Sequence, residues 1–154
     1  MFKKLFVPLI AAASLSLAGC MAMPADLNLA PDRVTAHSKY QVRLLPVAEP
    51  VQINQLHAWE IRLQSPSGQA ITGAQIAVGG GMPQHGHGFP TKPRVTRELG
   101  DGRYLLEGMK FSMPGWWEIK LRIDGSAGRD EVTFNTIIAA GPALPPLAAN
   151  RLRP

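Results

Sequence analysis

One eight-residue stretch decides the fold of this chain: Trp117-Glu118-Ile119-Lys120-Leu121-Arg122-Ile123-Asp124. Apolar and polar side chains alternate along it, which is the pattern of a β-strand with one buried and one exposed face. The stretch His57-Ala58-Trp59-Glu60-Ile61-Arg62-Leu63-Gln64 alternates in the same way. Trp59 and Trp117 lie on the apolar faces of these two strands, so we expect both indoles in the core.

Four further segments are predicted to be strands: residues 41–47, 74–78, 102–111 and 132–136. Turn sequences such as Ser65-Pro66-Ser67-Gly68 separate the strands. No segment has a sustained helical period. Short strands with one apolar face each can bury that face by packing in two layers. We therefore predict an all-β fold, an immunoglobulin-like antiparallel β-sandwich of about seven strands.

The first twenty residues are predicted to be a secretion signal. Lys3 and Lys4 precede an apolar run, Leu5 to Leu17, that is shorter than the roughly 20 residues needed to span a bilayer. The run ends in Leu17-Ala18-Gly19-Cys20, which resembles the bacterial lipobox. Residues 1–19 are then a lipoprotein signal peptide, and Cys20 carries the lipid. The alternative is an ordinary signal peptide with an incidental cysteine.

The predicted organisation of the mature chain is a lipid-anchored tether over 20–39, a β-sandwich domain over 40–140 and a proline-rich tail over 141–154. Met21, rather than Asp, follows Cys20, which in similar lipoproteins favours the outer membrane over the inner. We expect the lipid bilayer as one partner and a domain that faces the periplasm.

Composition excludes several kinds of function. Without Lys3 and Lys4 the chain has 14 Lys and Arg against 11 Asp and Glu, a formal charge of +3. The basic residues are scattered, so no nucleic-acid partner is expected. Cys20 is the only cysteine, and once lipidated it leaves no thiol for a disulfide, a nucleophile or a metal ligand.

One segment has the composition of a binding loop: Gly79-Gly80-Gly81-Met82-Pro83-Gln84-His85-Gly86-His87-Gly88-Phe89-Pro90. Its glycines permit unusual backbone conformations, and His85 and His87 are spaced to share one side of an extended chain. A second segment, Met109 to Trp117, contains Met113-Pro114, which echoes Met82-Pro83. Both segments follow predicted strands and could meet at one end of the sandwich.

Imidazole and thioether groups without thiolate or carboxylate form a donor set for copper, with Cu(I) favoured. Zinc would be expected with carboxylates or a third histidine, and residues 79–90 contain no acidic residue. The alternative is a glycine-rich loop whose histidines are merely solvated, with Met109 and Met113 as core residues.

Residues 57–138 resemble the FixH/YtkA-like family of small envelope β-sandwich domains. The resemblance rests on Met82-Pro-Gln-His-Gly-His-Gly88, on Gly-Asp-Gly-Arg-Tyr104 and on Phe111-Ser-Met-Pro-Gly-Trp-Trp-Glu118. It implies a copper-related role without catalysis. By motif position it assigns the copper ligands to Met82, His85, His87 and Met113. His57 and Met109 are additional candidates, and His37, in the tether, is expected to play no part.

Two functions remain open. The first is an anchored lipoprotein that binds copper and passes it to a copper-receiving envelope protein. The second is a metal-free protein–protein interaction module on the same anchored sandwich. An enzyme is not expected, because the chain contains no Gly-x-Ser-x-Gly elbow and Ser112 has no evident partner base.

Overall fold

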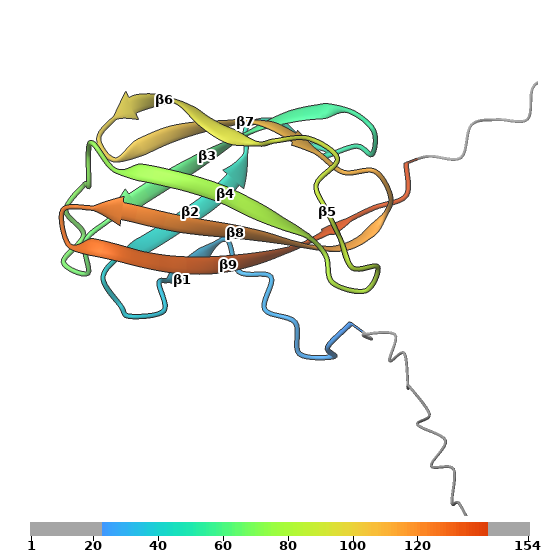
Figure 1. Cartoon of the computed structure of the whole chain (residues 1–154), viewed down its shortest axis with the longest axis horizontal. Coiled ribbons are helices and arrows are strands. Elements are labelled where there is room, and N and C mark those ends of the chain that lie inside the picture. Colours follow the sequence, from blue (N-terminus) through green and yellow to red (C-terminus); the bar gives the residue numbers. More distant parts are fainter. Residues whose placement is uncertain (1–22, 142–154) are drawn as a thin grey trace, which may run out of the picture.

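Residues 23–141 are described by a computed structural model of the chain (Figure 1). Every regular element in these residues is a β-strand, and the strands form two antiparallel sheets. The first sheet contains, in spatial order, β1 (Asp32–Val34), β2 (Gln41–Pro46), β3 (Leu56–Gln64), β7 (Arg103–Lys110) and β6 (Arg94–Gly100). The second contains β5 (His87–Gly88), β4 (Gln75–Met82), β8 (Gly115–Gly125) and β9 (Gly128–Ile138). The predicted all-β sandwich is confirmed.

The alternating stretches form the central strands of the two sheets. β8 pairs with β4 on one side and β9 on the other, and β3 lies between β2 and β7. The apolar residues of both stretches face the interior, where Trp59 is 5% and Trp117 0% exposed. Both tryptophans are therefore core residues, as predicted, and the strand alternation sets the two apolar faces against each other.

Three strands were not predicted from the sequence. β6 is an edge strand whose residues are mostly exposed, so it lacks the alternation that marks a half-buried strand. β5 has only two residues and pairs with the end of β4. β1 lies within the segment predicted to be a tether and pairs with β2, so the sandwich begins before residue 40.

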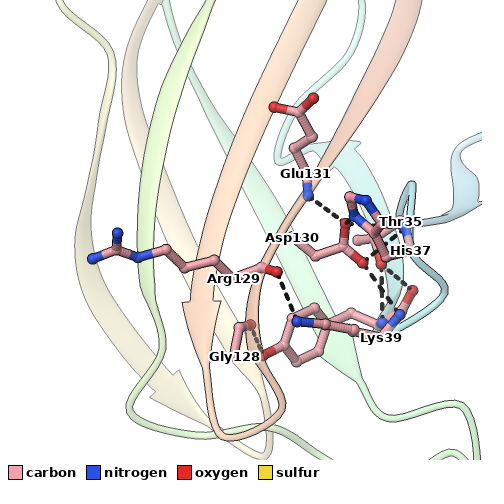
Figure 2. A network of polar contacts seen from close by, with 8 residues as sticks. Thr35, His37, Lys39, Gly128, Arg129, Asp130 and Glu131 are labelled. Atoms are coloured by element: carbon pink, nitrogen blue, oxygen red, sulfur yellow. Dashed lines mark hydrogen bonds and ion pairs between the residues drawn. The ribbon is translucent and has the colours of Figure 1, made fainter.

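The turn between β1 and β2 is fixed against the start of β9 by one buried carboxylate (Figure 2). Asp130 accepts hydrogen bonds from the backbone N–H groups of His37 and Lys39 at 3.1 and 3.2 Å, and from the ring Nδ1 of His37 at 2.9 Å. Tyr40 adds a hydrogen bond from its hydroxyl to the Gly128 carbonyl at 2.6 Å. The residues just before β2 are thus part of the folded domain.

Trp116 is also buried, although its neighbour Trp117 faces the core and strand alternation places Trp116 on the opposite face. Its Nε1 donates to Asn135 Oδ1 at 2.9 Å, and Asn135 Nδ2 donates to the Asn28 carbonyl at 3.0 Å. The segment before β1 therefore lies against the outer face of the second sheet. The predicted signal peptide, Cys20 and residues 142–154 of the predicted tail lie outside the described residues.

Candidate metal site

The predicted binding loop is a β-hairpin. β4 ends at Met82 and β5 begins at His87, and these two residues are paired across the hairpin. The N–H groups of His85 and Gly86 both donate to the Met82 carbonyl, at 3.1 and 3.0 Å, and close the turn. The backbone that carries the two histidines is therefore held by hydrogen bonds to β4.

Glycine allows the backbones around this hairpin to approach closely. A Cβ on Gly81 would overlap the carbonyl oxygen of His87, and a Cβ on Gly80 would overlap the carbonyl oxygen of Glu118. Neither overlap can be relieved by a side-chain movement, because both atoms belong to paired strands. The glycines thus hold β5 and β8 at the distances that the hairpin requires.

Met82 and His87 present their side chains on one face of the hairpin, because directly paired residues in an antiparallel ladder share a face. The Met82 side chain is buried, with 2% of its surface exposed. The His87 ring is exposed and meets Trp117 edge-on, with ring centroids 5.6 Å apart. A buried thioether and an accessible imidazole therefore lie side by side over the core.

The hydrogen bond of the His87 ring decides which of its two nitrogens is free to bind a metal ion. Its Nδ1 lies 3.1 Å from the carbonyl oxygen of Gly88, and a carbonyl can only accept, so Nδ1 carries the proton. The lone pair is then on Nε2. Metal-binding histidines commonly use this arrangement, in which one nitrogen donates to a backbone carbonyl and the other binds the ion.

His85 lies beside His87. The two rings are nearly parallel, at an interplanar angle of 20°, with centroids 5.9 Å apart. Two imidazoles bound to one ion at about 2.0–2.1 Å would have ring centroids roughly 5–6 Å apart. The observed centroid distance falls within this range, and both rings are open to solvent.

Met113 belongs to the segment that joins β7 to β8, and two contacts bring this segment to the hairpin. Trp117 Nε1 donates to the Met113 carbonyl at 3.1 Å. A Cβ on Gly115 would lie 3.1 Å from the Met82 terminal methyl, so the end of the Met82 side chain touches the start of β8. The two Met-Pro segments thus lie at the same end of the sandwich, and Met113 is 36% exposed.

The two additional candidates lie apart from this group. Met109 is buried in the core on β7, in the other sheet, where it pairs with His57. His57 starts β3 in the other sheet, where its Nε2 lies 2.7 Å from the Gln52 carbonyl oxygen. His57 contacts Phe111, Phe111 contacts Trp117, and Trp117 contacts His87. Two aromatic rings therefore separate the two imidazoles.

One charged residue near the hairpin was missed by sequence reasoning. Glu118 is far from the histidines in sequence, but it pairs with Gly81 and lines an open hollow of about 530 Å³ beside His87. Strand alternation places it on the face opposite to the buried Trp117, where Lys120 Nζ lies 2.9 Å from its carboxylate. The pairing of β4 with β8, which sequence does not reveal, brings it there.

Carboxylates and histidines alone do not make a metal site in residues 23–141, because no three His, Cys, Asp or Glu side chains are grouped to hold an ion. A site at the hairpin therefore depends on methionine sulfur. This donor set of two imidazoles and two thioethers fits Cu(I) better than zinc.

Across residues 23–141, no helix has the length and hydrophobicity to cross a bilayer.

The fold and this end hairpin define a class of protein, a small β-sandwich domain with histidine and methionine gathered at one end of its second sheet. The chain belongs to the YtkA-like family, which it matches over residues 35–122, more than half of its 154 residues. The match begins in the turn before β2, extends through most of β8 and includes the entire hairpin. Comparisons with curated proteins and with solved structures found no match.

Proposed function

We propose that this YtkA-like protein binds one copper ion, preferentially Cu(I), at the end of the sandwich. The observation that carries the proposal is the cross-strand pair of Met82 and His87, with a thioether and an imidazole on one face. His85 lies beside His87, and Met113 lies on the neighbouring segment. These four residues would hold the ion.

The preference for Cu(I) follows from the donors. Thioether sulfur is neutral and polarizable, so it binds a soft monovalent ion well and a hard divalent ion poorly. The Glu118 carboxylate, which lines the hollow beside His87, is engaged with Lys120 on the opposite face of the sheet. Because imidazole must be neutral to bind, copper affinity is expected to fall as the solution becomes acidic.

Copper is the cargo in this proposal, and the protein is not an enzyme. The predicted lipobox supports anchoring through acylated Cys20, with the domain facing the periplasm and the outer membrane preferred. An ion held by neutral donors on an accessible hairpin can be exchanged with another protein. We propose that the receiver is a copper-binding protein of the envelope.

The experiment is a competition titration of Cu(I) against a chromophoric chelator, with the chain from Met21 to Pro154. Changing both His85 and His87 to Ala should abolish Cu(I) and Cu(II) binding. Changing both Met82 and Met113 to Leu keeps the side-chain volume, and should weaken Cu(I) while leaving a Cu(II) signal from the imidazoles. His57→Ala is the matched control, because this histidine lies in the other sheet.

Equal competition by the wild type and the double histidine variant would exclude the hairpin as a copper site. The metal-free interaction module would then be the better description. Binding that His57→Ala weakens as strongly as the hairpin changes would instead place the ion at a different position. Circular dichroism of each variant checks that the sandwich is intact.

A further inference from the structure

Three arginines lie side by side across the outer face of the first sheet. Arg43 on β2 pairs directly with Arg62 on β3, and Arg62 pairs with Arg103 on β7. Directly paired residues share a face, and like charges in such positions destabilise a sheet. Asp32 forms an ion pair with Arg43, and Glu60 lies 3.7 Å from Arg103. Arg62, at the centre of the row, forms no ion pair with the described residues. The row is unfavourable within the isolated domain, and it favours an anionic partner.

The two outer faces of the sandwich differ in net charge. Strand pairing places five arginines and three carboxylates on the outer face of the first sheet: Arg43, Arg62, Arg94, Arg97, Arg103, Asp32, Glu60 and Glu107. Lys110, which pairs with the exposed Leu56, adds a further positive charge at the end of β7. The outer face of the second sheet has three charges of each sign: Lys120, Arg122, Arg129, Glu118, Asp124 and Glu131. The first face is therefore positive and the second is neutral.

Exposed aliphatic side chains lie among these arginines. Val34, Leu45, Val47 and Leu56 are 56%, 43%, 60% and 70% exposed. A hollow of about 390 Å³ on this face is lined by both kinds of side chain: Arg43, Arg62, Leu45, Pro46, Val47 and Glu60. Buried apolar area and attraction to anionic lipids together hold a protein at a membrane surface. An acidic protein would compensate the arginines, but a bilayer also accepts the aliphatic side chains between them.

The predicted anchor can reach the membrane that this face would contact. The carbonyl of Asn28 accepts a hydrogen bond from Asn135 on β9, and Asn28 is eight residues after Cys20. Eight residues span at most about 26–29 Å, whereas packed sheets lie about 10 Å apart. A lipid on Cys20 can therefore enter the bilayer that the first sheet faces.

We propose that the outer face of the first sheet lies on a bilayer that contains anionic lipids. Its arginines pair with lipid phosphates, and Leu45 and Val47 enter the layer between the headgroups and the acyl chains. The hairpin with the candidate copper site belongs to the second sheet and takes no part in this contact. Membrane contact and copper binding can therefore be tested separately.

The test is co-sedimentation of the chain from Met21 to Pro154, which lacks Cys20, with lipid vesicles. One set contains phosphatidylcholine alone, and the other contains equal parts of phosphatidylcholine and phosphatidylglycerol. Binding should require phosphatidylglycerol and should weaken as salt is raised. Changing both Arg62 and Arg97 to Gln should weaken binding at least tenfold, because each basic residue at an anionic surface contributes roughly fivefold.

The matched control for charge changes both Lys120 and Arg122 to Gln. It removes the same charge from the outer face of the second sheet, and should weaken binding less than threefold. No binding to the anionic vesicles, equal binding to both sets, or equal losses in the two double variants would overturn the proposal. An acidic protein would then be the remaining partner for this face.

The aliphatic side chains have a matched pair as well. Leu45 and Ile137 are 43% and 45% exposed, and they lie in different sheets. Leu45→Ser should weaken vesicle binding about threefold or more, and Ile137→Ser should leave it unchanged. Wild-type binding by Leu45→Ser would also overturn the proposal, because a face that needs only its arginines suits an acidic protein. Far-ultraviolet circular dichroism checks that each variant keeps its β-structure.

Discussion

The carboxylate of Asp130 holds the backbone and the ring of His37, two residues that lie 93 positions apart in the chain. The Asp130 side chain is completely buried, whereas 76% of the His37 side chain is exposed. The contact fixes the turn before β2 to the first residues of β9 (Figure 2). It joins the two sheets at the edge where β1 and β9 meet.

Replacing Asp130 with Asn should destabilise the domain by about 2–3 kcal/mol. The amide keeps the shape of the carboxylate but loses its charge and turns an NH₂ group toward backbone donors. Urea unfolding followed by tryptophan fluorescence measures the free energy of unfolding. Asp124→Asn is the control: Asp124 forms an exposed ion pair with Arg129 at 2.8 Å, and such pairs contribute about 0–1 kcal/mol. Equal losses in both variants would contradict a special role for Asp130.

The same carboxylate should make the domain sensitive to acid. Burial by itself would raise the pKa of Asp130, but the hydrogen bonds from Thr35 and His37 and from the Glu131 backbone outweigh it and lower that pKa far below its usual range. The unfolded chain, with an ordinary Asp pKa of about 3.9, then takes up a proton before the folded chain does. Stability from Asp130 is therefore complete above about pH 5 and is lost as the pH falls below 4.

Unfolding free energies measured between pH 7 and pH 3 check this dependence. The wild type should lose stability below pH 4, and Asp130→Asn should show a flatter profile over the same interval. Parallel profiles would assign the acid sensitivity to other carboxylates.

A methyl group at Gly81 should disrupt the hairpin. Its Cβ would overlap the His87 carbonyl oxygen, so β5 must move away from β4 and the pair of Met82 and His87 separates. We expect Gly81→Ala to weaken copper binding at least tenfold. Gly79→Ala is the control, because no atom lies within 4 Å of a Cβ at Gly79. The chelator competition described above measures both variants, and equal affinities would show that the strand pairing is not needed.

Trp59→Ala should cost about 3–5 kcal/mol of stability, because it removes a large aromatic side chain from the core. Trp59→Phe should cost less, since it retains a ring beside Phe111 and removes a buried N–H that has no partner. Denaturant unfolding compares the two. A loss for Trp59→Phe as large as that for Trp59→Ala would indicate that the indole N–H contributes to stability through a bound water or ligand.

The anchor can be tested in cells. Cys20→Ser removes the thiol that the lipid would modify, so the variant should leave the membrane fraction or keep its signal peptide uncut. Two acyl signals are needed for stable anchoring, and a lipidated N-terminus supplies them. Fractionation followed by mass spectrometry of the N-terminus is the measurement. A variant that is processed and stays bound to the membrane like the wild type would exclude lipidation at Cys20.

The alternation of apolar and polar residues was enough to predict six of the nine strands in the described residues and the core tryptophans, because strand period and burial are local properties of the sequence. The same local reasoning placed histidine and methionine in two segments at strand ends. Three of the four edge strands, β1, β5 and β6, escaped it. β6 buries little of either face, and β1 is three residues long, so neither carries the pattern.

The pairing of strands decides which residues that are distant in sequence lie side by side. Alternation alone does not fix the register of that pairing, because a shift of two residues keeps the same side chains on the same face. The sequence by itself determined the sandwich class and the residue types of the candidate site, and it predicts the secretion signal. Tertiary structure alone set His87 opposite Met82, brought Glu118 beside the hairpin and linked Trp116 through Asn135 to the segment before β1. It also turned His37 from an expected tether residue into a partner of Asp130, because a buried carboxylate selects its donors by position in space.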